Sequence, residues 1–584
     1  MNGAELLTKT LIAHNVKITW GITGGVLIPL FDAMLNESDN IKNILTRHEQ
    51  GAVHAAEGYS RALGKPGVCI GTSGPGATNL VTGIMDAYMD SVPIIALGGQ
   101  VATHLIGNDA FQETDMYGIT MPITKHSFAL RDSDKIGITL TKAFKIATEG
   151  RPGPVYIDMP IDVLKKEVGS HHAHYAHHIK QAYIEGFQPT LIPNHRQVVR
   201  AAELILKAER PVLIAGGGVI IANASNELAE LATLLFIPVV TTLQGKGCFD
   251  ERHPLALGVI GMHGKKVANY AQINADVIIA IGTRFSDRIT GNLASYAEHA
   301  KVIHVDIDPA EIGKNVKVEV PIVGDAKNTL IALIQVIKKL MRKNEKNAWS
   351  EKLMQFKEIC DKCILIGKIG GKEANVPNVR IHPRQIIDVL NFVLKEDDIV
   401  TTGVGQHQMF AMHFLKRSRP RTFISSGGSG TMGFGLPSAM GAKIAMPNKN
   451  VINIDGDGSF QMNIQELGTI KENNINITSM IFNNSYLGMV RQWLEIFYGK
   501  RYAQVNLGKN IQFAKIAEAY GLNGEVVERS SELNEKIKNA IKSDVATVLD
   551  VRIEEESNIL PMLPPGGNLK QMFGPCIKGP DQWF

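Results

Sequence analysis

Short apolar runs alternate along most of the chain with longer stretches of helical periodicity. Over residues 1–165, apolar runs at 68–71 and 94–97 fit buried strands between amphipathic helices. The same alternation returns over residues 194–341 and 381–550. Alternating strands and helices predict a parallel sheet with helices on both faces, so we expect three doubly wound α/β domains.

Two connecting stretches interrupt the alternation. Residues 166–193 contain five histidines within 171–178. We interpret this stretch as a solvated linker, with adventitious metal binding as the alternative. Residues 342–380 form a charged, helical connector, in which Cys360 and Cys363 have CxxC spacing. We interpret the two cysteines as one helix face, and a zinc or redox role is the alternative.

The chain ends in a segment that fits neither periodicity. Residues 551–584 include the run PMLPPGG, where prolines and glycines disfavour regular helix and strand. We expect this tail to be a loop that becomes ordered over a site.

Length and composition fit a cytoplasmic protein of several domains. The 584 residues exceed what a single core supports. A net charge of +4 without a long basic run does not indicate nucleic acid as a partner. Five cysteines, a low and odd number, indicate a reducing compartment. Apolar runs stay well short of the roughly 20 residues that span a bilayer, and the N-terminus resembles neither a signal peptide nor a transit segment.

The third domain contains the sharpest chemical motif. A short apolar strand at 451–454 runs into Gly456, Asp457 and Gly458, and the next predicted strand stops near Asn484. Glycines let the backbone turn sharply and approach a ligand, and the helix that follows can cradle a diphosphate. A carboxylate, an amide oxygen and a loop carbonyl suit Mg²⁺. The alternative is an ordinary glycine-rich turn between a strand and a helix.

Other polar residues follow predicted strands in the first two domains. Glu49 opens a helix of small residues, an unusual place for a carboxylate; the alternative is a charge that complements the helix dipole. In the middle domain, the run GGGVIIA after the strand at 210–215 only loosely matches a dinucleotide fingerprint. Asp306 follows another strand and would suit a ribose hydroxyl.

The spacing from GDGS to NN resembles the diphosphate-binding motif of thiamine diphosphate (ThDP) enzymes. Nearly the whole chain is similar to the acetohydroxyacid synthase (acetolactate synthase) family, in particular the large catalytic subunits of the biosynthetic, FAD-containing type. The motifs that carry the resemblance are RHEQGA, TSGPGATN, GNDAFQE, GRPGPV, RFSDRITG, GVGQHQM, SGGSGTMGFGLP and PMLPPGG. RFSDRITG separates the chain from the FAD-free, catabolic members. The resemblance implies a pyrimidine-binding first domain, an FAD-binding middle domain and a diphosphate-binding third domain.

The resemblance also implies roles for single residues. Glu49 would hydrogen-bond the aminopyrimidine ring of ThDP, and Met432 would hold the coenzyme in its bent form. Arg288 would bind the carboxylate of the second substrate, and Trp493 would shape the pocket for its alkyl group. The alternatives are a surface ion pair for Arg288 and a core aromatic for Trp493. Gly25, Phe111 and Gln112 would line the site from the first domain.

The implied ligand sets are larger. Mg²⁺ would be held by Asp457, Asn484 and the backbone carbonyl of Tyr486. The other residues expected at ThDP are Val404, Gly405, Gln406, His407, Gly456, Gly458 and Ser459. Those expected at FAD are Arg151, Gly216, Gly217, Thr242, Leu243, Met262, His263, Gly282, Arg284, Asp287, Asp306 and Asp325.

The implied reaction is decarboxylation of pyruvate and transfer of the two-carbon unit to a second 2-oxo acid. Pyruvate as acceptor gives 2-acetolactate and 2-oxobutyrate gives 2-aceto-2-hydroxybutyrate, both on the route to branched-chain amino acids. Because Glu49 and Asp457 meet across a subunit interface in this family, a homodimer is the expected minimum, and a separate small regulatory subunit is common. Competing interpretations are an FAD-linked pyruvate oxidase and a non-catalytic nucleotide-binding subunit.

The chain departs from the family pattern at two places. Ile22 and Thr23 stand where the glycine turn of the first domain usually has an aromatic residue and proline, and Ile161 stands where lysine is common. Both bear on the rigidity of the pocket and on inhibitor binding rather than on the chemistry.

Overall fold

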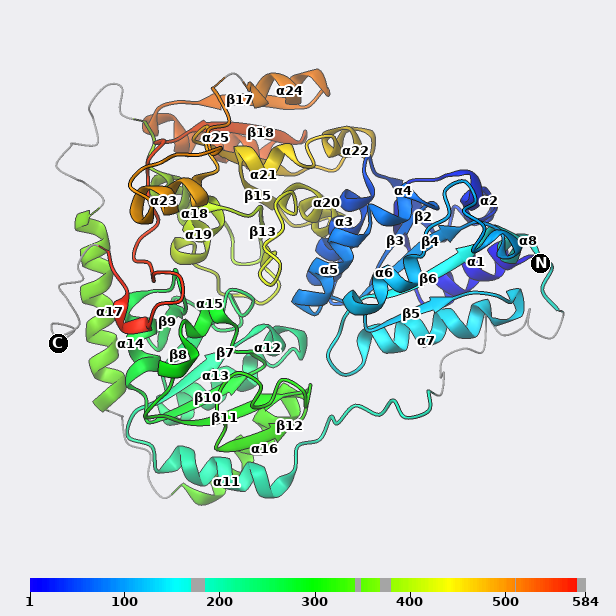
Figure 1. Cartoon of the computed structure of the whole chain (residues 1–584). Coiled ribbons are helices and arrows are strands. Elements are labelled where there is room, and N and C mark those ends of the chain that lie inside the picture. Colours follow the sequence, from blue (N-terminus) through cyan, green and yellow to red (C-terminus); the bar gives the residue numbers. More distant parts are fainter. Residues whose placement is uncertain (170–183, 342–347, 368–379, 510, 575–584) are drawn as a thin grey trace.

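The computed structural model describes residues 1–169, 184–341, 348–367, 380–509 and 511–574, without the side chains of 362–367. Within these ranges the chain forms three parallel sheets of six strands each, so the predicted fold class is confirmed. The histidine-rich run at 171–178 lies outside the described residues. In Figure 1 the middle sheet (green) lies below the third (yellow to orange), and the first (blue to cyan) lies beside the third. No helix in these ranges is both long and apolar enough to cross a bilayer.

The first sheet has the strand order β2-β1-β3-β4-β6-β5. Its strands are β1 (Ile18–Gly21), β2 (Lys42–Leu45), β3 (Gly67–Gly71), β4 (Ile94–Gln100), β5 (His126–Ala129) and β6 (Val155–Pro160). Its helices are α1 (Gly3–Ala13), α2 (Ile28–Asn36), α3 (Glu49–Leu63), α4 (Pro75–Thr78), α5 (Val81–Asp90), α6 (Met116–Thr120), α7 (Ile136–Thr148) and α8 (Ile161–Lys165). The residues of β3, β4 and β6 are all buried, as expected for strands covered on both faces.

The third sheet has the order β14-β13-β15-β16-β18-β17, which repeats the connectivity of the first sheet place for place. Its strands are β13 (Ile399–Thr402), β14 (Phe423–Ser425), β15 (Val451–Gly456), β16 (Thr478–Asn483), β17 (Asn523–Val527) and β18 (Thr547–Arg552). Its helices are α18 (Pro383–Val393), α19 (Gln406–Phe414), α20 (Gly435–Ala445), α21 (Asp457–Gln461), α22 (Glu466–Glu472), α23 (Gly488–Phe497), α24 (Phe513–Ala519) and α25 (Leu533–Lys542).

The middle sheet has the order β12-β11-β10-β7-β8-β9. Counted along the chain this is the 3-2-1-4-5-6 order of the dinucleotide-binding fold, with its switch point between β7 and β10. Its strands are β7 (Pro211–Ala215), β8 (Val239–Thr241), β9 (Ala256–Val259), β10 (Val277–Ile281), β11 (Lys301–Asp306) and β12 (Val320–Val323). Its helices are α11 (His195–Leu206), α12 (Gly217–Ile221), α13 (Ser225–Leu235), α14 (Lys266–Asn274), α15 (Asp287–Thr290) and α16 (Ala326–Leu340). β7 and β11 match the strand predicted at 210–215 and the one predicted before Asp306, whereas β9 and β12 were not predicted.

Helix α3 of the first domain packs closely against α20 of the third. A Cβ atom added to Gly58 would lie 2.0 Å from the carbonyl oxygen of Ser438, and one added to Gly441 would lie 1.8 Å from that of Ala55. Only glycine fits at such a helix crossing, because the opposing atoms belong to backbone. One buried apolar cluster accordingly spans both domains, from Trp20 to Val548.

The connector and the tail both pack on the middle domain. Helix α17 (Ala348–Gly367) contains both cysteines of the CxxC pair, and Cys360 is buried in the cluster that also contains Leu563 of the tail. The amide of Leu563 donates to the carbonyl of Met262 at 2.8 Å. Up to Gly574, the tail therefore joins the middle domain to the third. Its residues after Ile553 do not line the large cavity between these two domains that is described below.

Candidate active site

A cavity of about 930 Å³ lies where the middle and third sheets meet. The predicted residues on its wall are Arg151, Gly217, Thr242, Leu243, Met262, His263, Gly282, Arg284, Arg288, Asp306, Asp325, Val404, Gly405, Gln406, His407, Met432, Gly456, Asp457, Gly458, Ser459, Asn484, Tyr486 and Trp493. The structure thus brings together residues that are more than 300 positions apart in the chain. Their elements reach the cavity at the carboxyl ends of strands, where ligands bind in open α/β sheets.

The third domain presents its oxygen ligands at one end of this cavity. Asp457 begins α21 and accepts hydrogen bonds from the amides of Gly458, at 2.9 Å, and Ser485, at 2.6 Å. Asn484 follows β16, and its side-chain oxygen accepts from the amide of Tyr486 at 3.1 Å. The two side chains therefore approach the same loop from neighbouring strands, β15 and β16.

The glycines of this motif differ in one respect from the prediction. Neither Gly456 nor Gly458 has a positive φ, so the chain passes from β15 into α21 without a left-handed turn. They are needed for close approach instead. A Cβ on Gly456 would lie 2.6 Å from Nδ1 of His407, and one on Gly458 would lie 2.8 Å from Cδ2 of Leu487 and 3.5 Å from Cε of Met432.

Burial shifts the ionisation of this end of the cavity. It raises the pKa of Asp457 and of Asp455 to about 7 each, and it lowers the pKa of His407 to about 3. A buried carboxyl of this kind is stabilised as a carboxylate only by a cation or by hydrogen-bond donors. Among the described residues, Nε2 of His407 has no hydrogen-bond partner and lies 3.7 Å from Oδ1 of Asp455. The donor set therefore fits a divalent cation with an anionic ligand.

The middle domain contributes a crevice at its switch point. The amide of Gly216 donates to the last residue of β10, and a Cβ there would lie 2.0 Å from the carbonyl oxygen of Gly282. Gly217 and Gly282 line the cavity, whereas Gly216 holds the two loops together and does not line it. At the end of β11, burial raises the pKa of Asp306 to about 6. These features fit an extended dinucleotide better than a small metabolite.

Arg288 and Trp493 also line the cavity. Nη1 of Arg288 lies 3.4 Å from Sδ of Met262, and its Nε is 3.7 Å from a carboxylate oxygen of Asp287. The ion-pair alternative therefore holds in the single chain, but the Arg288 side chain is 59% exposed and lines the cavity, so the pair leaves it accessible to an anion there. Asp287 does not line the cavity. Trp493 packs partly against the apolar cluster of the middle domain and also lines the cavity, so the core alternative holds in part and the indole is accessible to a ligand.

Of the predicted residues in the first domain, Arg151 lines this cavity, whereas Glu49, Gln112, Phe111 and Gly25 do not. Glu49 begins α3, is 7% exposed, and accepts a hydrogen bond from Nδ2 of Asn79 at 3.0 Å. Gln112 has a left-handed backbone, with φ of 62°, and lies 3.5 Å from the hydroxyl of Ser73. Phe111 is 87% exposed, and a Cβ on Gly25 would meet nothing within 4 Å. Of these four residues, Gly25 and Phe111 are exposed, Gln112 is partly buried and Glu49 is buried.

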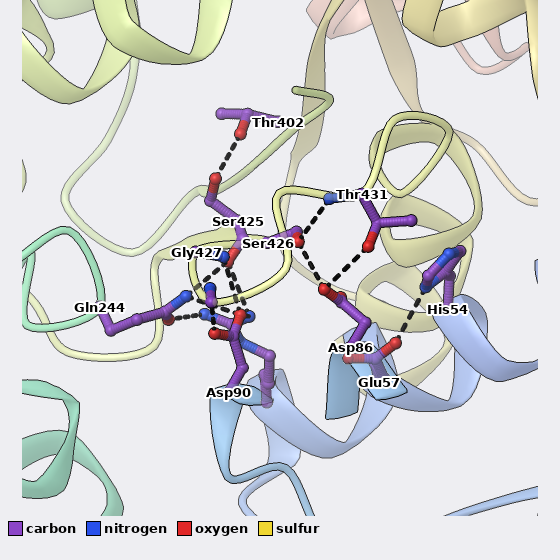
Figure 2. Close-up of polar contacts among 12 residues, drawn as sticks. His54, Glu57, Asp86, Asp90, Gln244, Thr402, Ser425, Ser426, Gly427 and Thr431 are labelled. Carbon is purple, nitrogen blue, oxygen red and sulfur yellow. Dashed lines mark hydrogen bonds and ion pairs between the residues drawn. The ribbon is translucent and has the colours of Figure 1, made fainter. Parts of the chain in front are cut away.

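Buried polar residues that the sequence analysis missed join all three domains (Figure 2). Asp90, on α5, accepts hydrogen bonds from the amides of Gly427 and Gly428 at 2.9 and 2.7 Å and from Nε2 of Gln244 at 2.7 Å. Asp86, one helical turn earlier, accepts from the hydroxyl of Ser426 at 2.5 Å. The spacing of two acids by four positions in an otherwise apolar helix was the only available signal.

His54, Glu57 and Asp86 form a fully buried cluster beside this junction (Figure 2). Nδ1 of His54 lies 2.9 Å from Oε1 of Glu57. Burial raises the pKa of Glu57 and of Asp86 well above the usual range and lowers that of His54 to about 4. Two adjacent carboxyls in an apolar site cannot both ionise, so we interpret the cluster as proton-sharing.

Comparison with known protein families shows which class of enzyme the chain resembles over its three domains. Three family models match it: the N-terminal TPP binding domain of thiamine pyrophosphate enzymes over residues 1–119, their central domain over 198–333, and their C-terminal TPP binding domain over 403–551. Thiamine pyrophosphate is another name for ThDP, so the fold and the strand-end loops are those of a ThDP enzyme.

Curated relatives narrow the class. A "Probable acetolactate synthase large subunit" of Methanocaldococcus jannaschii is 50% identical over 581 residues, which cover 98% of this chain and 95% of the relative. A protein with the same description from Methanococcus aeolicus is 49% identical over 100% of this chain and 97% of its own length. The "Acetolactate synthase large subunit" of Buchnera aphidicola is 42% identical, covering 98% of each chain. The chain therefore belongs to the acetolactate synthase large-subunit family.

Proposed function

We propose that the chain catalyses ThDP-dependent decarboxylation of pyruvate and joins the two-carbon unit to a second 2-oxo acid. The main observation behind this proposal is that one cavity is lined by Asp457 and Asn484 and also by an exposed cation, Arg288, and an aromatic side chain, Trp493. The first pair suits a metal-bound diphosphate. The second pair suits a small carboxylate with a short alkyl group.

The third domain would hold the coenzyme through Mg²⁺. Asp457, Asn484 and the carbonyl of Tyr486 supply the hard oxygen ligands that this ion prefers. The N-terminus of α21 offers backbone N–H groups toward the diphosphate, and Met432, close to Gly458, provides an apolar support. The thiazolium ring of ThDP, when bound, supplies an electron sink for the loss of carbon dioxide.

Arg288 and Trp493 would determine which 2-oxo acid binds as the acceptor of the two-carbon unit. The guanidinium binds the carboxylate of the second 2-oxo acid and orients its keto group, and the indole borders the alkyl group. One methylene in such a pocket is worth about 1–3 kcal/mol, so 2-oxobutyrate and pyruvate would be distinguished without either being excluded. The products would be 2-aceto-2-hydroxybutyrate and 2-acetolactate, precursors of branched-chain amino acids such as isoleucine and valine.

FAD would occupy the middle crevice. The support is the 3-2-1-4-5-6 strand order, the glycine loops after β7 and β10, and the carboxyl of Asp306 at the end of β11. The proposed reaction includes no net oxidation, so the flavin would serve a structural purpose. Bound flavin that is not reduced by pyruvate under anaerobic conditions would support this assignment; stoichiometric bleaching coupled to acetate would instead indicate a pyruvate oxidase.

A homodimer would complete the site. Glu49 is buried at the start of α3 and does not line the cavity of its own chain, whereas Phe111 of the same domain is exposed. A second copy would bring its Glu49 to the aminopyrimidine ring of ThDP held by Asp457 of the first. Mixing Glu49→Gln with Asp457→Ala chains tests this, because mixed dimers keep one intact site. Random pairing should restore about one quarter of wild-type activity. No recovery would contradict the shared site.

The direct test measures acetolactate formed from pyruvate by the purified chain. Product should appear only when ThDP and Mg²⁺ are both present, and a competition between pyruvate and 2-oxobutyrate should yield both products. The relatives' description as large subunits supports a separate small subunit as a further partner in the cytoplasm. Lack of any pyruvate consumption with saturating cofactors would overturn the proposal.

A further inference from the structure

The repeated strand order gives the first and third domains matching parts. Helix α3 follows the second strand of its sheet, and α20 follows the second strand of the other. Likewise α5 comes two helices after β3, and α22 comes two helices after β15. The two second-strand helices pack against each other, as the contacts of Gly58 and Gly441 show. Matching parts therefore face each other across the junction.

Glu466, the first residue of α22, reaches across this junction to the loop in front of α3. Its Oε1 accepts hydrogen bonds from the amides of Arg47, at 2.9 Å, and His48, at 3.0 Å. Its Oε2 accepts one from the hydroxyl of Thr469 at 2.6 Å. The side chain is fully buried. An anion held by two successive amides at a helix N-terminus is in a favourable position, since the helix dipole also attracts it.

Asp90, at the end of α5, makes the corresponding contact in the opposite direction. Each of its two oxygens accepts one backbone amide of the loop in front of α20, from Gly427 and Gly428. This side chain is also buried, and Figure 2 shows it pointing toward the loop that contains Gly427. In both cases a carboxylate from one domain binds two successive amides that precede the matching helix of the other domain.

The two loops bound in this way carry the residues that would handle the coenzyme. Glu49 comes directly after Arg47 and His48, and Met432 comes four residues after Gly428. We propose that Glu466 and Asp90 are reciprocal positioning residues, each fixing the backbone from which the opposite domain presents Glu49 or Met432.

In the dimer of the proposed function, on which this inference rests, Glu466 and Asp90 serve two different active sites. Met432 would act on the coenzyme held by its own chain, whereas Glu49 would act on the coenzyme held by the second copy. We call each of these contacts, a carboxylate that accepts two successive backbone amides of the other domain, a clamp. Both clamps lie in the same chain, on either side of the packed helices α3 and α20. A single chain would therefore contain positioning residues for both active sites of the dimer.

Amide hydrogen exchange of the full-length protein without cofactors tests the clamps directly. In Glu466→Ala, the amides of Arg47 and His48 lose their acceptor, so the peptide over 46–52 should exchange at least tenfold faster, with the peptide over 427–432 unchanged. Asp90→Ala should give the converse pattern. Glu466→Gln keeps a carbonyl oxygen that accepts both amides and should restore protection.

Glu472→Ala serves as the matched control, because Glu472 is exposed on the same helix, six positions away. It should leave both peptides at wild-type rates. If Glu466→Ala does not fold, Glu466→Asp replaces it, since the shorter side chain withdraws the carboxylate while keeping its charge. Unchanged exchange at 46–52, or equal loss of protection in the Gln and Ala variants, would overturn the inference.

A second readout addresses the function of the clamp. In the reconstituted enzyme, exchange of the C2 proton of bound ThDP depends on the glutamate at the aminopyrimidine ring and is measurable without substrate. We expect Glu466→Ala to slow it tenfold or more and Glu466→Gln to leave it within threefold of wild type. If the wild-type chain consumes no pyruvate while exchange at 46–52 still responds, the proposed function fails and the clamp stands. If the wild type is active and 46–52 does not respond, the clamp fails alone.

Discussion

Substituting Gly58 by alanine should separate the first and third domains. The new Cβ would lie 2.0 Å from the carbonyl oxygen of Ser438 and 2.6 Å from its carbonyl carbon. Carbon and oxygen atoms in close contact are about 3.3 Å apart, so α3 and α20 must move apart by more than about 1 Å. Neither opposing atom belongs to a flexible side chain, so local relaxation does not relieve the contact.

That movement would also break the Glu466 clamp. Bonds of 2.9 and 3.0 Å to Arg47 and His48 would lengthen toward about 4 Å, beyond hydrogen-bonding range. Overpacking costs about 1–3 kcal/mol, and each bond to a charged acceptor contributes about 1.5–3 kcal/mol. The better helix propensity of alanine returns about 1 kcal/mol. A net loss of about 3 kcal/mol or more follows.

Scanning calorimetry at a fixed scan rate, paired with acetolactate turnover, measures the effect. We expect the unfolding temperature of Gly58→Ala to fall by about 5 °C and turnover to fall by more than the loss of folded protein explains. Gly468→Ala is the matched control, because its Cβ would meet only side-chain atoms of Arg47 and Tyr520, at 3.3 Å. That variant should melt within about 1 °C of wild type. A wild-type melting curve for Gly58→Ala would refute the close crossing of α3 and α20.

Three further predictions concern chemistry. Glu49→Gln should slow acetolactate formation by two orders of magnitude or more with ThDP still bound, measured by turnover and by coenzyme titration; undiminished turnover would contradict the assigned role. Trp493→Leu should change the 2-oxobutyrate to pyruvate product ratio by about tenfold in a competition assay, and an unchanged ratio would place the indole outside the acceptor pocket. Glu57→Gln should flatten the pH dependence of stability. Because burial raises the pKa of Glu57, the native state holds a proton that the unfolded chain releases above about pH 4.5, so wild-type stability falls as pH rises through this window. Melting temperatures between pH 5 and 8 test this, and equal slopes in both proteins would argue against the proton-sharing cluster.

The fold was largely predictable because most strands are continuous apolar runs that end in glycine or polar residues. β15 and β16 stood out on this basis, and the motif after β15 pointed to the residues that we propose bind Mg²⁺. β9 and β12 were not predicted from the sequence. β9 contains glycine and lies among turns, and β12 is half-buried and contains a proline. Short edge strands carry little periodicity.

The candidate site was predictable only where a local motif specified it. Asp457 and Asn484 were found because their spacing along the chain reflects two adjacent parallel strands. Glu466 and Asp90 were not found, because each acts on backbone amides contributed by a distant segment. A carboxylate that binds backbone leaves no side-chain partner in the sequence, so its role is visible only when the two domains are placed together.

Gln244 bears on how the three sheets behave mechanically. It lines the middle crevice, donates to Asp90 of the first domain, and donates to the carbonyl of Ser425, which ends β14 in the third. A molecule seated in the crevice would thus press on a side chain that holds the neighbouring domains together. A flavin that takes no part in electron transfer would still stabilise the contacts among the three domains. Removing it would weaken the contacts of Gln244 with Asp90 and Ser425, and with them the position of the loop that carries Met432.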